Sequence, residues 1–355
     1  MGPLIPDDSS PAARALRRVG NIAIELSVFV VLTALLPVFL VVALILDLAL
    51  WLRTRKPWMT VRLILLAWWF LLGELYGLIG LLAIWVLSLG RDSKRRRQRV
   101  YALKRRWLGS HLLGLRALFS LRFESEDLNL AGPGPMLVMT RHSSIIDNAL
   151  PDVIIGGAHG IGFRFVIKRE LRALPTIDIG GRWVPTLFVR RASGDTEAEL
   201  QKMHELCRDL GSADALLLYP EGTRCTDEKL ARAKEIIAER QPEIAPLADR
   251  LSYVLPPRLG GALTLLQNAD PADVVIFGHV SLDGFEYLSD IWSGSLVGTT
   301  VRMRFWRFRS EEVPRGDRGA LIAWLYERWL ELDAWVGETR AGAGARAQAK
   351  AAGGT

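Results

Sequence analysis

The N-terminal quarter of the chain is dominated by two long apolar runs. The first, LSVFVVLTALLPVFLVVALIL, covers residues 26–46, and the second covers residues 63–89 with Glu74 as its one charged residue. A helix needs roughly 20 apolar residues to cross the hydrocarbon core of a bilayer, so both runs are long enough. The pattern therefore predicts a polar leader over residues 1–19 and a two-helix membrane hairpin over residues 20–90.

Basic residues flank both runs. The leader carries Arg14, Arg17 and Arg18, and the segment RDSKRRRQRVYALKRR follows at residues 91–106. Because Lys and Arg mark the cytoplasmic side of membrane segments, both ends of the hairpin are expected on that side. The connector between the runs is also basic, which fits equally well a hairpin that enters one leaflet without crossing. Both placements stay open, and residues 91–119 are expected to form a basic juxtamembrane linker or helix.

Acidic residues interrupt the apolar runs at Glu25, Asp47 and Glu74. Intramembrane acids are costly and often functional. Glu25 and Asp47 lie near the ends of a run, where they reach headgroups at little cost, whereas Glu74 is central. Glu74 is expected to have either a functional role or a structural partner within the hairpin.

The pattern changes after residue 120 to short apolar runs separated by helical stretches. The runs MLVMT, FRFVIK, ALLLYP and VVIFGHV are typical of strands buried on both faces. Helical patterns lie between several of them, at residues 197–210 and 228–239. This alternation predicts an α/β fold, a mostly parallel mixed sheet flanked by helices, over residues 120–338. Residues 301–308 are expected as an outer strand, residues 319–336 as a helix, and residues 339–355 as a disordered tail.

Composition narrows the class of partner. The net charge of +7 fits nucleic acid, an anionic membrane or an acidic substrate. The apolar runs favour the membrane, and basic stripes interleaved with aromatic residues are largely missing, so no nucleic acid is expected. The two cysteines, Cys207 and Cys225, form neither a disulfide framework nor a zinc pattern.

Two motifs follow strands directly, where ligands bind in α/β sheets. In the first, His142-Ser143-Ser144-Ile145-Ile146-Asp147, the carboxylate of Asp147 is placed to accept the imidazole Nδ1–H and leave Nε2 as a base. A polar turn with a capping Asp explains this short pattern about equally well. The second motif is Tyr219-Pro220-Glu221-Gly222-Thr223-Arg224, in which Arg224 offers a fork suited to phosphate. Its alternative is an ordinary Pro-Glu-Gly turn.

Further cations are expected near strand ends. Lys168 ends one strand, Arg191 follows Phe188-Val189-Arg190, and Arg258 follows the rigid turn Val254-Leu255-Pro256-Pro257. Each of them taken singly also fits a solvated basic surface.

The order of these motifs resembles the glycerolipid acyltransferase family, which includes 1-acylglycerol-3-phosphate acyltransferases. The resemblance covers residues 120–285 and the hydrophobic N-terminal anchor. It implies that His142 is a general base oriented by Asp147, and that Glu221, Gly222, Thr223 and Arg224 form an acceptor-binding block. It also implies that Lys168 and Arg191 hold the acceptor phosphate, with Arg258 a further candidate for substrate contact. The family uses no metal, cofactor or acyl-enzyme, and its donor is acyl-CoA or acyl carrier protein.

Departures from the family pattern affect the acceptor. Arg141 stands where many members have Asn, Pro185 where the second block often has Gly, and Pro257 where the fourth often has Val or Ile. The stretch Leu-Pro-Pro-Arg-Leu-Gly-Gly resembles the lysophosphatidylinositol and lysocardiolipin acyltransferase arm. The first expected acceptor is lysophosphatidic acid, and a remodelling enzyme acting on lysophosphatidylinositol or a related lysolipid is the alternative.

Two further functions stay open. A lipid hydrolase with Ser143 as nucleophile predicts a covalent acyl-serine, and a non-enzymatic membrane adaptor predicts function that survives His142→Ala. The expected location is the cell membrane, with the catalytic domain facing the cytoplasm and with membrane lipids as partners.

Overall fold

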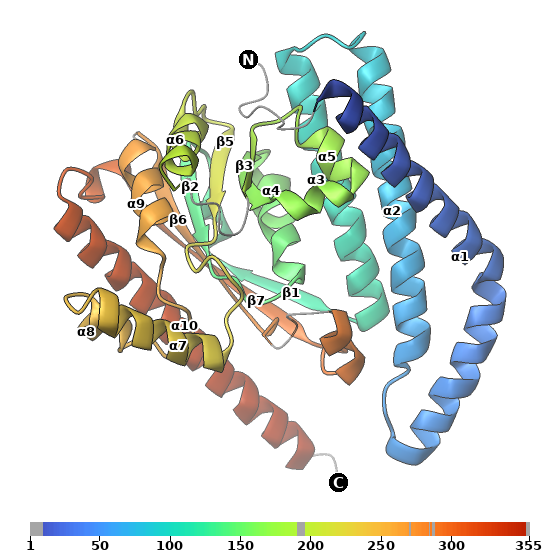
Figure 1. Ribbon diagram of the computed structural model, residues 1–355. Helices are drawn as coiled ribbons and strands as arrows, with labels where there is room; N and C mark the ends of the chain where they lie inside the picture. Colours follow the sequence, from blue (N-terminus) through green and yellow to red (C-terminus); the bar gives the residue numbers. More distant parts are fainter. Residues whose placement is uncertain (1–9, 190–195, 270, 284, 286–287, 353–355) are drawn as a thin grey trace. The chain divides into compact units, whose positions relative to one another are not determined.

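A computed structural model describes residues 10–189, 196–269, 271–283, 285 and 288–352. The chain forms two compact units. The first comprises Met1–Arg122, Ala149–Leu206 and Leu288–Thr299, and the second comprises Phe123–Asn148, Cys207–Tyr287 and Thr300–Thr355. Their elements carry the same labels in Figure 1.

The second unit is built on a mixed sheet. Its strands are β1 (Arg122–Glu126), β2 (Met136–Thr140), β5 (Asp214–Leu218), β6 (Asp273–Val280) and β7 (Thr300–Phe308), in the order β1-β7-β6-β2-β5. β2 runs parallel to both β5 and β6, and β7 runs antiparallel to β6. The predicted α/β class with a mostly parallel mixed sheet is therefore confirmed. β7, which was expected as an outer strand, lies next to β1 at the edge of the sheet. β1 was not predicted, because its polar sequence (RFESE) lacks the hydrophobic pattern of a buried strand.

Helices and short turns complete this unit. The helices are α7 (Asp227–Arg240), α8 (Ala245–Ala248), α9 (Leu259–Asn268) and α10 (Arg318–Ala352), with short turns η1 (Leu128–Ala131), η2 (Ile146–Ala149) and η6 (Ser310–Glu312). Of these, α10 packs on β6. β2 is buried at every position, as its continuous apolar run predicts. The buried face of α10 includes Leu321, Leu325, Trp329 and Leu332. This helix continues to Ala352, across much of the segment expected to be disordered.

The first unit contains the N-terminal helices and a pair of parallel strands, β3 (Gly162–Lys168) and β4 (Thr186–Val189). Its longer helices are α1 (Pro11–Thr54), α2 (Met59–Leu87), α3 (Lys94–Phe119) and α6 (Thr196–Cys207). Shorter turns complete it: η3 (Pro151–Ile155), α4 (Gly156–His159), η4 (Arg169–Ala173), α5 (Pro175–Gly180) and η5 (Leu288–Ser293).

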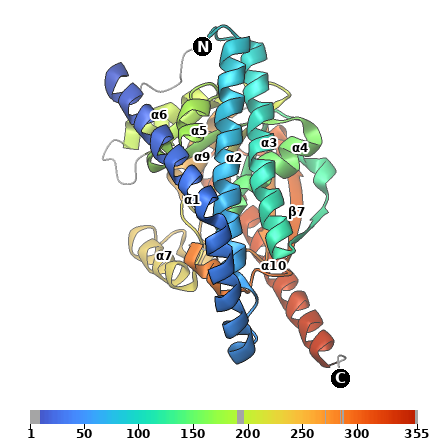
Figure 2. The same ribbon diagram turned by 90° about the vertical axis from the view of Figure 1, so that its right-hand side faces the viewer.

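Helices α1 and α2 form the predicted hairpin and run side by side (Figures 1 and 2). Both are long and apolar enough to cross a membrane, and in α1 only 6% of the most apolar stretch is buried. The carboxylate of Asp47 on α1 accepts hydrogen bonds from the backbone amides of Thr60 and Val61, at 3.0 and 2.9 Å. Asp47 thus satisfies the first free amides of α2, and it explains why an acid interrupts this apolar run.

Helix α2 packs on α3 through small residues. A Cβ at Gly73 would lie 2.5 Å from the His111 ring, and one at Gly114 would lie 2.3 Å from Trp69. The fully buried Glu74 accepts a hydrogen bond from Trp107 Nε1 at 3.1 Å, and its carboxylate lies 3.6 Å from His111 Nε2. The structural partner of Glu74 was expected within the hairpin. Its side-chain partners, Trp107 and His111, are instead on α3.

Both ends of the hairpin contact other parts of the first unit. At the start of α1, Arg17 and Arg18 pair with Asp178 of α5 at 3.2 and 2.7 Å. At the connector between α1 and α2, the Lys56 ammonium lies 4.1 Å from the centre of the Trp292 ring in η5. Both ends of the hairpin are therefore held by residues of the first unit that lie outside the hairpin.

Candidate functional site

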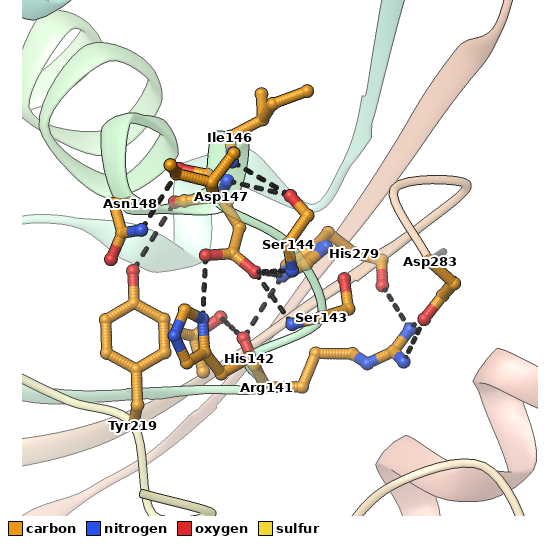
Figure 3. Close-up of polar contacts among 12 residues, drawn as sticks. Arg141, His142, Ser143, Ser144, Ile146, Asp147, Asn148, Tyr219, His279 and Asp283 are labelled. Atoms are coloured by element: carbon orange, nitrogen blue, oxygen red, sulfur yellow. Dashed lines mark hydrogen bonds and ion pairs between the residues drawn. The ribbon is translucent and has the colours of Figure 1, made fainter. Parts of the chain in front are cut away.

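The site is built on the loop that follows β2. The His142 side chain is 11% exposed, and its Nδ1 lies 3.0 Å from Asp147 Oδ1 (Figure 3). The other oxygen, Oδ2, accepts the amides of Ser143 and Ser144, each at 2.8 Å. Burial by itself raises the pKa of Asp147, but the hydrogen bond from His142, the electrostatic interactions with His142 and His279, and the Ser144 amide together hold this pKa below its ordinary value.

This geometry sets the tautomer of His142. An ionised carboxylate can only accept hydrogen bonds, so the proton facing Asp147 belongs to Nδ1, and Nε2 carries a lone pair in the neutral ring. Within the described part of the chain, Nε2 makes no hydrogen bond. The imidazole is thus arranged as a base with its acceptor nitrogen available.

The loop is short and fully capped. Ser144 Oγ accepts the amides of Ile146 and Asp147 at 2.9 and 3.3 Å, which fixes the turn into η2. The Tyr219 hydroxyl donates to the Asp147 carbonyl at 3.4 Å, and the Tyr219 ring lies 4.6 Å from that of His142. Ser144 therefore caps the start of η2.

Glu221 connects the motifs. It is 2% exposed, and its two carboxylate oxygens accept the amides of His142 at 2.8 Å and Leu255 at 3.2 Å. The carbonyl of His142 in turn accepts the Cys225 amide at 2.8 Å. Burial raises the pKa of Glu221 to about 8. The carboxylate is thus a buried link between three segments, and its expected contact with an acceptor stays a prediction.

Gly222 and Arg258 lie together. Gly222 has a φ of +66°, in the left-handed region that favours glycine, and a Cβ there would lie 2.8 Å from Arg258 Cδ. The Arg258 amide donates to the Pro220 carbonyl at 2.8 Å. Thr223 is half-buried, and the Arg224 carbonyl accepts from Lys229 Nζ at 3.3 Å. The second motif and the segment at Arg258 therefore lie in direct contact.

Lys168 and Arg191 are the two remaining candidates from the sequence. Lys168 is the last residue of β3, in the first unit. Arg191 lies outside the described residues. Their expected contact with an acceptor phosphate stays a prediction.

Three residues that sequence reasoning missed hold these loops. Asp333 on α10 accepts the amides of Ser252, Tyr253 and Val254 at 3.1, 2.6 and 2.9 Å. His279 is fully buried, and its Nε2 lies 3.1 Å from the Arg141 carbonyl. Asp283 pairs with the buried guanidinium of Arg141. The available signal for His279 was its place at the end of the strand that pairs with β2.

Comparison with known proteins gives a family match to the site-bearing region. Residues 122–276 match the sequence model of the acyltransferase family, which confirms the resemblance drawn from the motif order. The chain is 26% identical over 220 residues to "1-acyl-sn-glycerol-3-phosphate acyltransferase 3" of Arabidopsis thaliana, covering 61% of this chain and 56% of that protein. It is 34% identical over 165 residues to "Lyso-ornithine lipid O-acyltransferase" of Pseudomonas aeruginosa, covering 44% and 57%.

Two further similarities extend this set. The chain is 26% identical over 176 residues to "Lysocardiolipin acyltransferase 1" of Danio rerio, covering 48% of this chain and 43% of that protein. The chain thus spans less than two thirds of the length of each of these relatives. The crystal structure of the 1-acyl-sn-glycerophosphate (LPA) acyltransferase PlsC from Thermotoga maritima matches with a TM-score of 0.47 at 15% identity, over 76% of this chain and 96% of that one.

Proposed function

Because residues 122–276 match the model of the acyltransferase family, we propose that this chain is an O-acyltransferase. It moves a fatty acyl group from an acyl thioester to a hydroxyl of a lysophospholipid. The observation that carries the proposal is the buried His142–Asp147 pair, with Nδ1 facing the carboxylate at 3.0 Å. The transfer needs no metal or cofactor, only acyl-CoA or acyl carrier protein as co-substrate.

In the proposed reaction the acceptor attacks the thioester directly. Nε2 of His142 takes the proton of the acceptor hydroxyl while that oxygen bonds to the thioester carbonyl carbon. The tetrahedral intermediate then collapses, the carbon–sulfur bond breaks, and the imidazolium returns the proton to the leaving thiolate. Asp147 stabilises the imidazolium in between, and general-base catalysis of this kind contributes about 10²- to 10⁴-fold.

Lysophosphatidic acid is the first proposed acceptor. The proposal is supported by Arg258 beside Gly222, by the cation of Arg224 in the adjoining motif, and by the relative named for 1-acyl-sn-glycerol-3-phosphate. Lys168 and Arg191 are proposed to contribute to the same phosphate. A remodelling reaction on lysophosphatidylinositol or a related lysolipid is the alternative, and the lysocardiolipin relative favours it.

The test is thiol release from acyl-CoA or acyl carrier protein by purified protein. The acceptor panel comprises lysophosphatidic acid, lysophosphatidylinositol, lysocardiolipin and lyso-ornithine lipid. His142→Ala is measured beside His159→Ala, a matched change outside the motifs. Release that depends on one acceptor and disappears only in His142→Ala supports the proposal. Silence of every protein with both donors refutes it and favours the adaptor, and covalent labelling of Ser143 by a phosphonate favours the hydrolase.

We also propose that the hairpin lies in the cytoplasmic leaflet of the cell membrane without crossing it. A crossing hairpin would separate its two ends by about 30 Å of hydrocarbon. Arg18 at one end and Lys56 at the other both contact the same folded unit, through Asp178 and Trp292. Helix α1 has 44 residues, about 66 Å at 1.5 Å per residue, which suits a helix lying along a surface.

Cysteine labelling tests this placement. Arg55→Cys in the exposed connector, in a background without Cys207 and Cys225, is treated with a membrane-impermeant maleimide on inside-out and right-side-out vesicles. Labelling from the same side as a cysteine at exposed Asp249 is expected. Labelling of the connector from the opposite side would show a crossing hairpin.

A further inference from the structure

The peptide group between Arg141 and His142 is held from both sides. Its carbonyl, on Arg141, accepts a hydrogen bond from Nε2 of His279 at 3.1 Å. Its N–H, on His142, donates to Glu221 Oε2 at 2.8 Å. The orientation of this peptide group sets the direction of the His142 Cα–Cβ bond, and hence the position of the imidazole relative to Asp147.

Arg141 and His279 bind each other reciprocally. Nη1 of Arg141 donates to the carbonyl of His279 at 3.0 Å, while the His279 ring donates to the carbonyl of Arg141 (Figure 3). The Arg141 guanidinium is fully buried and also pairs with Asp283, to which Arg340 of α10 adds a second cation at 2.8 Å. A buried arginine with a paired carboxylate is rigid, since breaking the pair would leave an uncompensated charge.

The tautomer of His279 follows from its partner. A carbonyl oxygen only accepts, so Nε2 carries the proton. Nδ1 of His279 has no hydrogen-bond partner among the described residues. Burial lowers the pKa of His279, so the ring is neutral. Its Nε2 lies 3.7 Å from Asp147 Oδ2, and the N–H dipole favours the ionised carboxylate without adding a charge that would compete with His142.

We propose that His279 and Arg141 are positioning residues for the His142–Asp147 pair. They fix the peptide group from which His142 projects and act through His142, without touching either substrate. This inference rests on the proposed acyl transfer. It also predicts a property of the His142 ring that is measurable without any turnover.

His279→Leu is the informative variant. It removes the donor to the Arg141 carbonyl and fills the buried position with an apolar side chain of similar size. A displacement of a catalytic group by about 1 Å costs about 10²-fold in rate. The expected result is a loss of kcat of roughly 10- to 100-fold, with unchanged KM for donor and acceptor. His279→Gln is expected to recover most of the rate, since its Nε2 carries a donor at a similar reach.

Val280→Ala is the matched control, a buried position next along β6 that makes none of these contacts. Thermal unfolding of all variants shows which ones are folded. If folded His279→Leu keeps the wild-type kcat, or if its KM rises while kcat holds, the inference is wrong. It is also wrong if His279→Gln is as impaired as His279→Leu.

Nitrogen NMR of histidine-labelled protein gives the second readout. The wild type should show His142 in one tautomer, protonated on Nδ1, and Val280→Ala should match it. In His279→Leu the His142 signals should shift toward a mixture of tautomers. An unchanged His142 spectrum would overturn the inference whatever the activity. Silence of wild type with every acceptor would instead refute the proposed function and leave the NMR result to decide this one.

Discussion

Asp147→Asn separates the charge of the carboxylate from its shape. In the wild type, Oδ2 accepts two amides at 2.8 Å and Oδ1 faces His142 Nδ1 at 3.0 Å. An asparagine has one oxygen and one NH₂ group. The two amides of Ser143 and Ser144 require the oxygen at the Oδ2 position, because an NH₂ group there would meet two donors. The NH₂ group must then point at His142.

The consequence is the wrong tautomer of His142. With an NH₂ donor opposite Nδ1, the neutral ring accepts at Nδ1 and carries its proton on Nε2, so that Nε2 no longer takes the acceptor proton. The whole general-base contribution is then lost, about 10²- to 10⁴-fold in kcat. At 1.36 kcal/mol per decade this is on the order of 3 to 5 kcal/mol of transition-state stabilisation. The KM for the acyl donor should stay within about threefold, which is less than 1 kcal/mol.

The assay is the acceptor-dependent thiol release described above, with kcat and KM measured separately. Asp249→Asn, an exposed change of the same chemistry, is the control and should match the wild type. A rate for Asp147→Asn within threefold of the control would refute the assignment of His142 as a base oriented by Asp147. A large rise in KM with unchanged kcat would place Asp147 in binding instead.

Three further predictions follow from the contacts around the site and the hairpin. Glu221→Gln should weaken the pH dependence of stability. Burial raises the pKa of Glu221 to about 8 from an ordinary 4.5. The contribution of Glu221 to the free energy of unfolding is therefore fully favourable below pH 4.5 and is lost as the pH rises toward 8. Wild type should therefore lose thermal stability relative to the variant between pH 5 and pH 8, and parallel melting curves across that range would contradict this. Gly222→Ala should destabilise the fold by about 1 to 2 kcal/mol, the cost of a left-handed non-glycine residue. It should also raise the acceptor KM by displacing Arg258, while an unchanged melting point and KM would argue against this packing. Asp178→Asn should release the start of α1, so that trypsin cleaves at Arg17 and Arg18 faster than in wild type, with Asp249→Asn as control; equal cleavage rates would show that the ion pairs do not hold the helix.

Much of the fold could be predicted because its signals are local. The strands β2, β5 and β6 are continuous apolar runs, and such runs predict buried strands without knowledge of their neighbours. β1 was missed since its sequence, RFESE, has little apolar character. Its place beside β7 is set by backbone pairing and not by burial.

The partners of buried acids could not be predicted. Asp47 and Glu74 were recognised as unusual within apolar runs, but the sequence does not say which donors face them. Asp47 binds backbone amides of α2, and Glu74 binds side chains of α3. The partners of both acids depend on how the helices pack, through close contacts such as that of Gly73 with His111. Such contacts between helices produce no local pattern in the sequence.

The residues of the candidate site also fall into two groups, those that a local motif predicts and those that only the three-dimensional structure reveals. His142 and Asp147 lie five residues apart, so one loop brings them together, and a motif is enough to find them. Asp333 lies about eighty residues from the turn that it caps, and its three amide partners carry no side-chain signature. Backbone amides look identical in every sequence, so residues that act by binding them are visible only in three dimensions.

The loop that carries His142 is fixed by buried residues that are distant in the sequence, and this bears on the proposed reaction. A base must hold its lone pair toward the acceptor hydroxyl, and a loop residue has no ladder of backbone hydrogen bonds to fix it. The protein supplies that order with buried groups that bind the backbone of the loop: Glu221 on the His142 amide, His279 on the Arg141 carbonyl. Each of these bonds is made in the interior, where an unmade bond would cost about 1 to 3 kcal/mol. The loop therefore has little freedom to leave its position, and the orientation of His142 is established when the protein folds, before any substrate binds.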